Sequence, residues 1–165
     1  MPDAKIIDRY LAIFLLIAAG GPLLTAYISQ FGFGYEPCVL CVYQRIPYGV
    51  VIALGVLALF VKKPDIRRLI PLFAGLAFLI GSGIALYHVG VEQLWWESAA
   101  PCGASGAAVT NTQDFLAALQ KKPEKSCGDI DWTLFGISMA TYNVGVSLAL
   151  AIASFFAWRR MKDEA

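Results

Sequence analysis

The four cysteines carry the most obvious reactive chemistry of this 165-residue chain. Cys38 and Cys41 form a Cys-Val-Leu-Cys motif, and the other two cysteines are Cys102 and Cys127. A disulfide across a Cys-x-x-Cys motif closes a very small ring and adds little loop-closure stability, so it is better suited to opening and closing than to stapling. The sequence therefore predicts redox chemistry at Cys38 and Cys41.

The neighbours of this motif favour a thiolate. A helix is expected to start at or just after Cys41, where unpaired backbone N–H groups and the positive end of the helix dipole stabilise negative sulfur. Arg45 follows Cys41 by one helical turn, so its guanidinium is expected on the same face. The alternative is that Arg45 is an interface anchor whose charge reaches the membrane surface. Pro47 complicates the helix start, because proline prefers the first turn.

The elements that hold these residues are predicted from composition. Hydrophobic residues make up 58% of the chain and charged residues 15%, whereas soluble domains have about 45–50% and 25%. This composition excludes a soluble globular domain, and a formal net charge of +1 offers no basic surface for nucleic acid. Charge-free stretches long enough to cross a bilayer predict four transmembrane helices. They are expected near residues 10–29, 43–61, 69–88 and 136–158.

The predicted fold is all-α, a four-transmembrane-helix bundle that forms one membrane domain over residues 1–165. Loops 30–42 and 89–133 lie together on one side of the membrane. Within the longer loop, residues 112–121 predict a short amphipathic helix on the membrane surface. Removal of the first helix as a secretory signal peptide is the less favoured alternative, because its apolar core is long and no clear cleavage site follows.

Lys and Arg near the helix ends predict the orientation, since they are enriched on the cytoplasmic side. Both termini are therefore expected in the cytoplasm, and all four cysteines outside it. Cysteines confined to an oxidising compartment indicate disulfide chemistry. Nine of the thirteen Lys and Arg residues lie near the helix ends on the predicted cytoplasmic side: Lys5, Arg9, Lys62, Lys63, Arg67, Arg68, Arg159, Arg160 and Lys162.

The four cysteines have two alternative uses. Two structural bridges would staple the two outer loops, and the 24 residues between Cys102 and Cys127 make an ordinary closed loop. A zinc site would use all four cysteines, but only Cys38 and Cys41 show the two-residue spacing of zinc ligands. We therefore predict no metal.

A membrane dithiol needs an electron acceptor, and a lipid-soluble quinone is the natural one at this depth. Arg45 would stabilise the anionic oxygens that form when a quinone is reduced. His88, the only histidine, is expected at the outer end of the third helix, where it would hydrogen-bond or protonate a quinone oxygen. The alternative for His88 is a polar cap at the membrane surface.

The order of the motifs is specific. The segment Cys-Val-Leu-Cys-Val-Tyr-Gln-Arg (38–45) follows the first helix, Tyr87-His88 ends the third, and Asp-Trp-Thr-Leu-Phe-Gly (131–136) precedes the fourth. This order resembles the DsbB family of bacterial disulfide bond formation proteins over nearly the whole chain. Residue 44 is Gln, where that family often has an acidic residue, so a charge partner for Arg45 is missing by this comparison.

The resemblance implies a multi-pass enzyme of the bacterial inner membrane that reoxidises a periplasmic thioredoxin-fold oxidase of the DsbA type. It implies two redox-active disulfides, Cys38–Cys41 coupled to ubiquinone or menaquinone, and Cys102–Cys127 facing the partner. Arg45 matches the quinone-linked arginine of the family, and His88 matches a position near the quinone. The long loop is expected to move so that the two cysteine pairs meet.

Two other classes of protein compete with this interpretation. A membrane thiol oxidoreductase of the vitamin K epoxide reductase type shares the helix bundle and quinone chemistry. It normally carries its Cys-x-x-Cys motif near a later helix, whereas here the motif opens the second. A non-enzymatic membrane protein with structural disulfides is the other alternative, and its cysteines would be inert.

Overall fold

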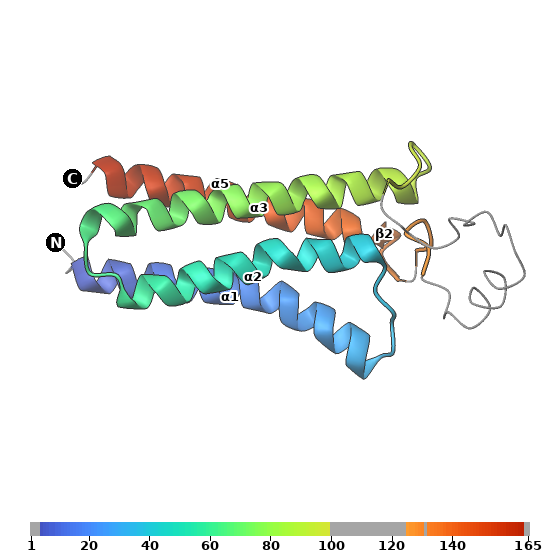
Figure 1. Ribbon diagram of the computed structural model, residues 1–165, viewed down its shortest axis with the longest axis horizontal. Coiled ribbons are helices and arrows are strands. Elements are labelled where there is room, and N and C mark those ends of the chain that lie inside the picture. The colour runs from blue at the N-terminus through green and yellow to red at the C-terminus, as the bar shows by residue number, and fades with distance from the viewer. Residues whose placement is uncertain (1–3, 100–124, 131, 164–165) are drawn as a thin grey trace, which may run out of the picture.

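Four long helices dominate the computed structural model, which describes residues 4–99, 125–130 and 132–163, with side chains from Tyr10 onward. They are α1 (Ala4–Gly32), α2 (Val39–Phe60), α3 (Pro64–Glu92) and α5 (Met139–Asp163), and they run side by side (Figure 1). Each is long and apolar enough to cross a membrane, which confirms the predicted four-helix membrane fold. Cys102 and the helix predicted at residues 112–121 lie outside the described residues.

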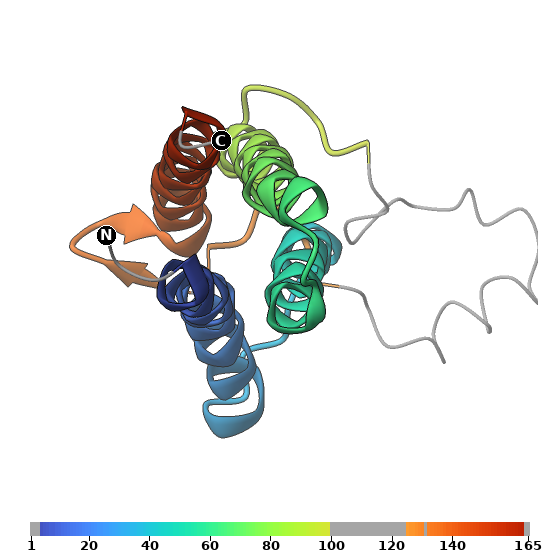
Figure 2. The ribbon, with the colours of Figure 1, turned by 90° about the vertical axis from the view of Figure 1, so that its left-hand side faces the viewer.

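The helices pack as a bundle (Figure 2), in which α2 contacts both α1 and α3, and α3 packs along α5. Phe78 is completely buried and meets the Tyr48 ring edge to face, with ring centres 5.8 Å apart. Most other core positions are small, such as Ala12, Ala74 and Ala151. Because lipid tails are as apolar as this core, close approach of small residues is the main source of helix association.

Helix α2 begins four residues before its predicted start, because Cys38 acts as its N-cap. The Cys38 sulfur accepts a hydrogen bond from the Cys41 backbone N–H at 3.3 Å. Sequence rules assign this role to Ser, Thr, Asp or Asn, so a sulfur cap gave no start signal. Pro47 lies inside α2. Cys41 therefore lies in the first turn of α2, whereas the sequence placed it in the loop 30–42.

Helix α3 also exceeds its predicted bounds at both ends. It starts at Pro64, which is suited to the first helical turn because it has no N–H to leave unpaired there. It continues to Glu92, so His88 lies one turn before the helix end. His88 and Glu92 are therefore neighbours on one face of α3.

A small hairpin precedes α5, which the all-α prediction did not contain. Strands β1 (Thr133–Leu134) and β2 (Ile137–Ser138) pair antiparallel. Phe135 and Gly136 form the turn with φ of 53° and 77°. Two positive φ values are the mark of the type I′ turn, which matches the twist of paired strands. The hairpin delays the start of α5 to Met139.

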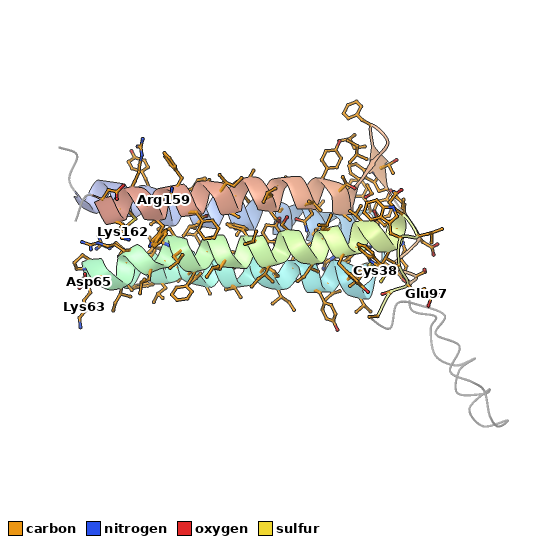
Figure 3. All side chains as sticks on the ribbon, turned by 90° about the horizontal axis from the view of Figure 1, so that it is seen from above. Cys38, Lys63, Asp65, Glu97, Arg159 and Lys162 are labelled. Carbon is orange, nitrogen blue, oxygen red and sulfur yellow. The ribbon has the colours of Figure 1, made fainter. Side chains whose placement is uncertain are left out.

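The two ends of the bundle differ in what they carry. Both termini and the α2–α3 connection lie at one end (Figure 1), and Lys63, Arg159 and Lys162 lie there, whereas Cys38 lies at the opposite end (Figure 3). Helix α1 diverges from α2 toward the cysteine end (Figure 1). Pro22 lies inside α1. A proline bends a helix because it removes one backbone hydrogen bond and its ring clashes with the preceding turn.

Candidate functional site

The centre of the site is a pair of thiols at the N-terminus of α2. Cys38 and Cys41 are free cysteines whose Sγ atoms are hydrogen-bonded at 2.9 Å. Cys38 is buried and Cys41 is half-buried. A disulfide bond measures about 2.05 Å between sulfurs, so oxidation of this pair, with loss of two electrons and two protons, needs only a small approach of the two side chains. The predicted Cys38–Cys41 disulfide remains a prediction, with the structure holding its dithiol form.

Stabilising contacts gather on the Cys38 sulfur. It accepts the N-cap hydrogen bond from the Cys41 N–H, and it lies 3.6 Å from Nε2 of His88. The hydrogen bond between the two thiols holds the pKa of the Cys38 thiol well below its ordinary value; burial opposes this, and His88 adds to the lowering. A helix that starts just after Cys41, as the sequence predicts, would favour the thiolate at Cys41. In the structure, the free backbone N–H of Cys41 instead points to the sulfur of Cys38, the N-cap residue.

His88 lies within the bundle, at 5% exposure, rather than capping it at the surface. Its Nε2 lies 3.2 Å from the Cys127 carbonyl oxygen and 3.8 Å from a carboxylate oxygen of Glu92. Its Nδ1 lies 2.8 Å from the side-chain nitrogen of Gln44. The ring therefore joins α2, α3 and the segment that carries Cys127.

Cys127 lies against the first cysteine pair. It is disulfide-bonded and 1% exposed, and it packs with Cys38, Leu40 and Val91 in one buried cluster. Its predicted partner, Cys102, lies outside the described residues. Cys127 itself lies in the same cluster as Cys38. Because Cys102 lies outside the described residues, the loop movement that brings the two pairs together stays a prediction.

Arg45 is held by α1. One guanidinium nitrogen donates to Oε1 of Gln30 at 2.5 Å, and the guanidinium lies 4.8 Å above the centre of the Tyr27 ring. The stacking on tyrosine adds a cation–π attraction. Because Gln30 is neutral, this hydrogen bond positions the charge of Arg45 without cancelling it. Arg45 and Cys41 lie one turn apart in α2 and line the same cavity, as the spacing predicts.

One cavity collects these groups. It has a volume of about 470 Å³, and the walls come from all four helices and from the segment that precedes α5. This volume is within the roughly 300–1,000 Å³ typical of small-molecule sites. Aliphatic side chains such as Leu23, Met139 and Val146 form much of the wall. The functional residues that line the cavity are Cys38, Cys41, Gln44, Arg45, His88 and Glu92.

Three of these residues also have the donor atoms of a metal site. One ligand atom each from Cys38, Cys41 and His88 lie within 4.8 Å of one another. Two thiolates and an imidazole are a donor set that zinc accepts. The sequence predicts no metal, and that prediction is tested by metal analysis of the purified protein.

The sequence predicted no contact of Gln44 or Glu92 with His88, and no contact of the half-buried Asn143 with Gln44. Glu92 is 6% exposed, and its other carboxylate oxygen accepts a hydrogen bond from Ser138. Its spacing of four residues from His88 on a helix was a usable signal. The contact of Gln44 with Asn143, 99 positions away, left no signal in the sequence.

Comparison with known proteins gives a consistent result over most of the chain. The sequence profile of the family described as disulfide bond formation protein DsbB matches residues 8–157. The disulfide bond formation protein B of Xylella fastidiosa is 30% identical over 136 residues, which cover 80% of this chain and 79% of that protein. Its counterpart in Xanthomonas campestris is 30% identical over 152 residues, 87% of each chain. That of Acinetobacter baumannii is 31% identical over 126 residues, 72% of each.

Proposed function

Because this chain belongs to the DsbB family of disulfide bond formation proteins and is a multi-pass membrane protein, we propose that it oxidises a periplasmic partner and reduces a membrane quinone. The partner is a thioredoxin-fold dithiol of the DsbA type. The observation that carries the proposal is the shared cavity, in which a Cys-x-x-Cys dithiol, a positioned guanidinium and a buried histidine face one apolar space.

The cavity fits a quinone on three physical grounds. Its apolar walls suit a ring with a hydrocarbon tail, and its volume suits a small molecule. Arg45 presents a positive charge that would stabilise negative charge developing on a quinone oxygen. A bound quinone would supply an acceptor for two electrons and two protons. Ubiquinone and menaquinone both meet these requirements, since both present a similar ring.

The electron path begins with thiol–disulfide exchange. A partner thiolate attacks the Cys102–Cys127 disulfide and bonds to Cys102, which releases Cys127 as a thiolate. The second partner thiol then breaks this mixed disulfide, so that the partner leaves oxidised and Cys102 and Cys127 become thiols. Each attack depends on the thiolate fraction and on access to the sulfur.

The second exchange passes the electron pair inward. Cys127 attacks the Cys38–Cys41 disulfide, and after resolution by Cys102 the outer disulfide reforms while Cys38 and Cys41 become thiols. The packing of Cys127 against Cys38 supports this exchange.

Purified protein provides a direct test. With reduced DsbA as electron donor and a short-chain ubiquinone analogue as acceptor, we expect turnover, which is measured as the loss of quinone absorbance. Cys41→Ser should abolish turnover, because the Cys38–Cys41 disulfide can no longer form. Full turnover by Cys41→Ser would contradict the proposed electron path, as would stoichiometric zinc in the active wild-type protein.

The same assay tests the role of Arg45. Arg45→Ala should raise the apparent KM for the quinone by roughly 10-fold or more, the effect of losing a hydrogen bond to a charged group worth about 1.5–3 kcal/mol. The apparent KM for reduced DsbA should stay unchanged, since the partner meets the other cysteine pair. An unchanged quinone KM would return Arg45 to the role of interface anchor.

A further inference from the structure

A chain of polar side chains, all buried except the half-buried Asn143, lies behind His88, where a membrane protein core would ordinarily be apolar. Gln44 of α2 lies 2.8 Å from Nδ1 of His88, and its Oε1 accepts a hydrogen bond from the side-chain nitrogen of Asn143 at 2.5 Å. Asn143 Oδ1 in turn accepts from the hydroxyls of Tyr48 and Ser147. Polar groups away from water are retained only when each is paired, so this chain has a defined arrangement.

The groups around Nε2 of His88 require a proton on that nitrogen. The Cys127 carbonyl oxygen, 3.2 Å away, can only accept a hydrogen bond. The Glu92 carboxylate at 3.8 Å and a Cys38 thiolate at 3.6 Å are also acceptors. A lone pair on Nε2 would face these acceptors without a hydrogen, so Nε2–H is the favoured form.

The polar chain determines the protonation state of the other ring nitrogen of His88, Nδ1. A tyrosine hydroxyl is a good donor, and Tyr48 lies 2.5 Å from Asn143 Oδ1. This contact orients the Asn143 amide so that its NH₂ group faces Gln44, and the Gln44 NH₂ group then faces Nδ1 of His88. A donor at Nδ1 is compatible only with an unprotonated Nδ1.

We propose that Gln44, oriented by Asn143 and Tyr48, is a positioning residue that holds His88 neutral, with its single proton on Nε2 and directed at the Cys38 and Cys127 side of the cavity. Amides cannot pass a proton along this chain without changing their own bonding. The chain therefore orients the Gln44 amide and does not conduct protons. His88 then acts as a hydrogen-bond donor to the Cys38 sulfur.

The relevance of this arrangement to catalysis rests on the proposed function. In the reduced pair, the Nε2–H of His88 stabilises the Cys38 thiolate, and Nδ1 is not available to exchange protons with the cavity. The DsbB family often has an acidic residue at position 44, and its replacement by Gln changes the direction of the hydrogen bond with Nδ1 of His88. A carboxylate at position 44 would accept a hydrogen bond from Nδ1–H, whereas Gln44 donates one.

Nitrogen NMR tests the arrangement directly, because His88 is the only histidine of the chain. Protein labelled with ¹⁵N-histidine, reduced and purified in detergent through a tag without histidine, should show one protonated ring nitrogen, Nε2, and one unprotonated, Nδ1. Gln44→Glu should convert the ring to the doubly protonated form at neutral pH. A protonated Nδ1 in the wild type, or a ring unchanged in Gln44→Glu, would overturn the proposal.

A matched control separates the hydrogen bond from the added charge. Gln30→Glu makes the same substitution in the same cavity, but Gln30 contacts Arg45 rather than His88. This variant should keep the wild-type ring signals; a doubly protonated ring in it would show a general effect of charge and would also overturn the proposal. The measurement needs neither quinone nor partner, so a correct ring signal without quinone turnover would refute the proposed function alone.

Discussion

At the scale of single residues, the site distinguishes two cysteines that look equivalent in the sequence. Cys38 receives the Cys41 backbone N–H and lies beside His88, so the contacts that favour a thiolate are concentrated on the first cysteine of the motif. In a Cys-x-x-Cys motif that caps a helix, the first sulfur lies outside the first turn and faces its free N–H groups. The lowered pKa of Cys38 makes it the stronger candidate for the thiolate of the reduced pair.

The first prediction concerns the dependence of Cys38 reactivity on pH. A thiol with a lowered pKa is already ionised below the ordinary value, so Cys38 should alkylate rapidly at neutral pH. His88→Ala removes a contact that lowers this pKa, so the alkylation midpoint of Cys38 should move to higher pH, by about one unit or more. Rapid alkylation at a series of pH values, with peptides identified by mass spectrometry, measures this midpoint.

Ser154→Ala is the control for this measurement. Ser154 is buried on α5, and its hydroxyl has no hydrogen-bond partner among the described residues. Its replacement should leave the Cys38 midpoint unchanged. A midpoint that is equal in wild type and His88→Ala would remove His88 from the environment of the Cys38 thiolate.

At the scale of helices, small residues allow neighbouring helices to pack closely, and prolines allow them to diverge. In α1, Pro22 follows two glycines, and the helix diverges from α2 toward the cysteine end (Figure 1). Pro22 lines the same cavity as Arg45. The Gly20-Gly21-Pro22 sequence is a local signal for a bend, because glycine and proline both weaken a helix interior. The cavity therefore depends on a feature of α1 that carries none of the reactive groups.

Helix contacts on the other side of the bundle lead to a second prediction. A Cβ atom at Gly75 of α3 would lie 2.8 Å from the Phe155 ring of α5, whereas a Cβ at Gly83 would meet no atom within 4 Å. Gly75→Ala should therefore lower thermal stability in detergent, because overpacking costs about 1–3 kcal/mol. Gly83→Ala should keep or raise stability, since alanine favours a helix by about 1 kcal/mol over glycine.

Both variants make the same change on the same helix, so each controls for the other. Their melting temperatures should differ with Gly83→Ala the higher. Equal melting temperatures would mean that Phe155 moves aside without cost and that α3 and α5 do not depend on the absence of a side chain at Gly75.

At the scale of the whole molecule, charge and chemistry are separated along the bundle axis. Lys63, Arg159 and Lys162 lie at one end and Cys38 and Glu97 at the other (Figure 3). The length of the helices places a hydrocarbon layer between these ends. Because Lys and Arg are enriched on the cytoplasmic side, this separation favours an orientation with the cysteines on the oxidising side.

The third prediction is the orientation itself. In a Gram-negative bacterial host, alkaline phosphatase fused after Glu97 should be active, because it folds only outside the cytoplasm, and a fusion after Lys63 should be inactive. A green fluorescent protein fused to the C-terminus should fluoresce, since it folds in the cytoplasm. The reverse pattern of activities would place the cysteines in a reducing compartment and contradict the predicted topology.

The sequence by itself determined the membrane fold, the number of spanning helices, the Cys-x-x-Cys motif and the family. Each of these is a local property of the chain: the length free of charge, the spacing of two cysteines, or the order of short motifs. It placed the start of α2 too late because sulfur is an unusual helix cap, and it missed the hairpin before α5 because two-residue strands leave almost no periodic pattern.

Only the tertiary structure decided which groups meet in the cavity. His88 lies 50 positions from Cys38 in the sequence, and Asn143 lies 99 positions from Gln44. Whether such residues touch depends on the rotation of each helix about its axis and on the bend of α1, which are set by packing against the other helices. For that reason the sequence identified the reactive cysteines, while the assignment of the stabilised thiolate to Cys38 and the polar chain behind His88 required the folded bundle.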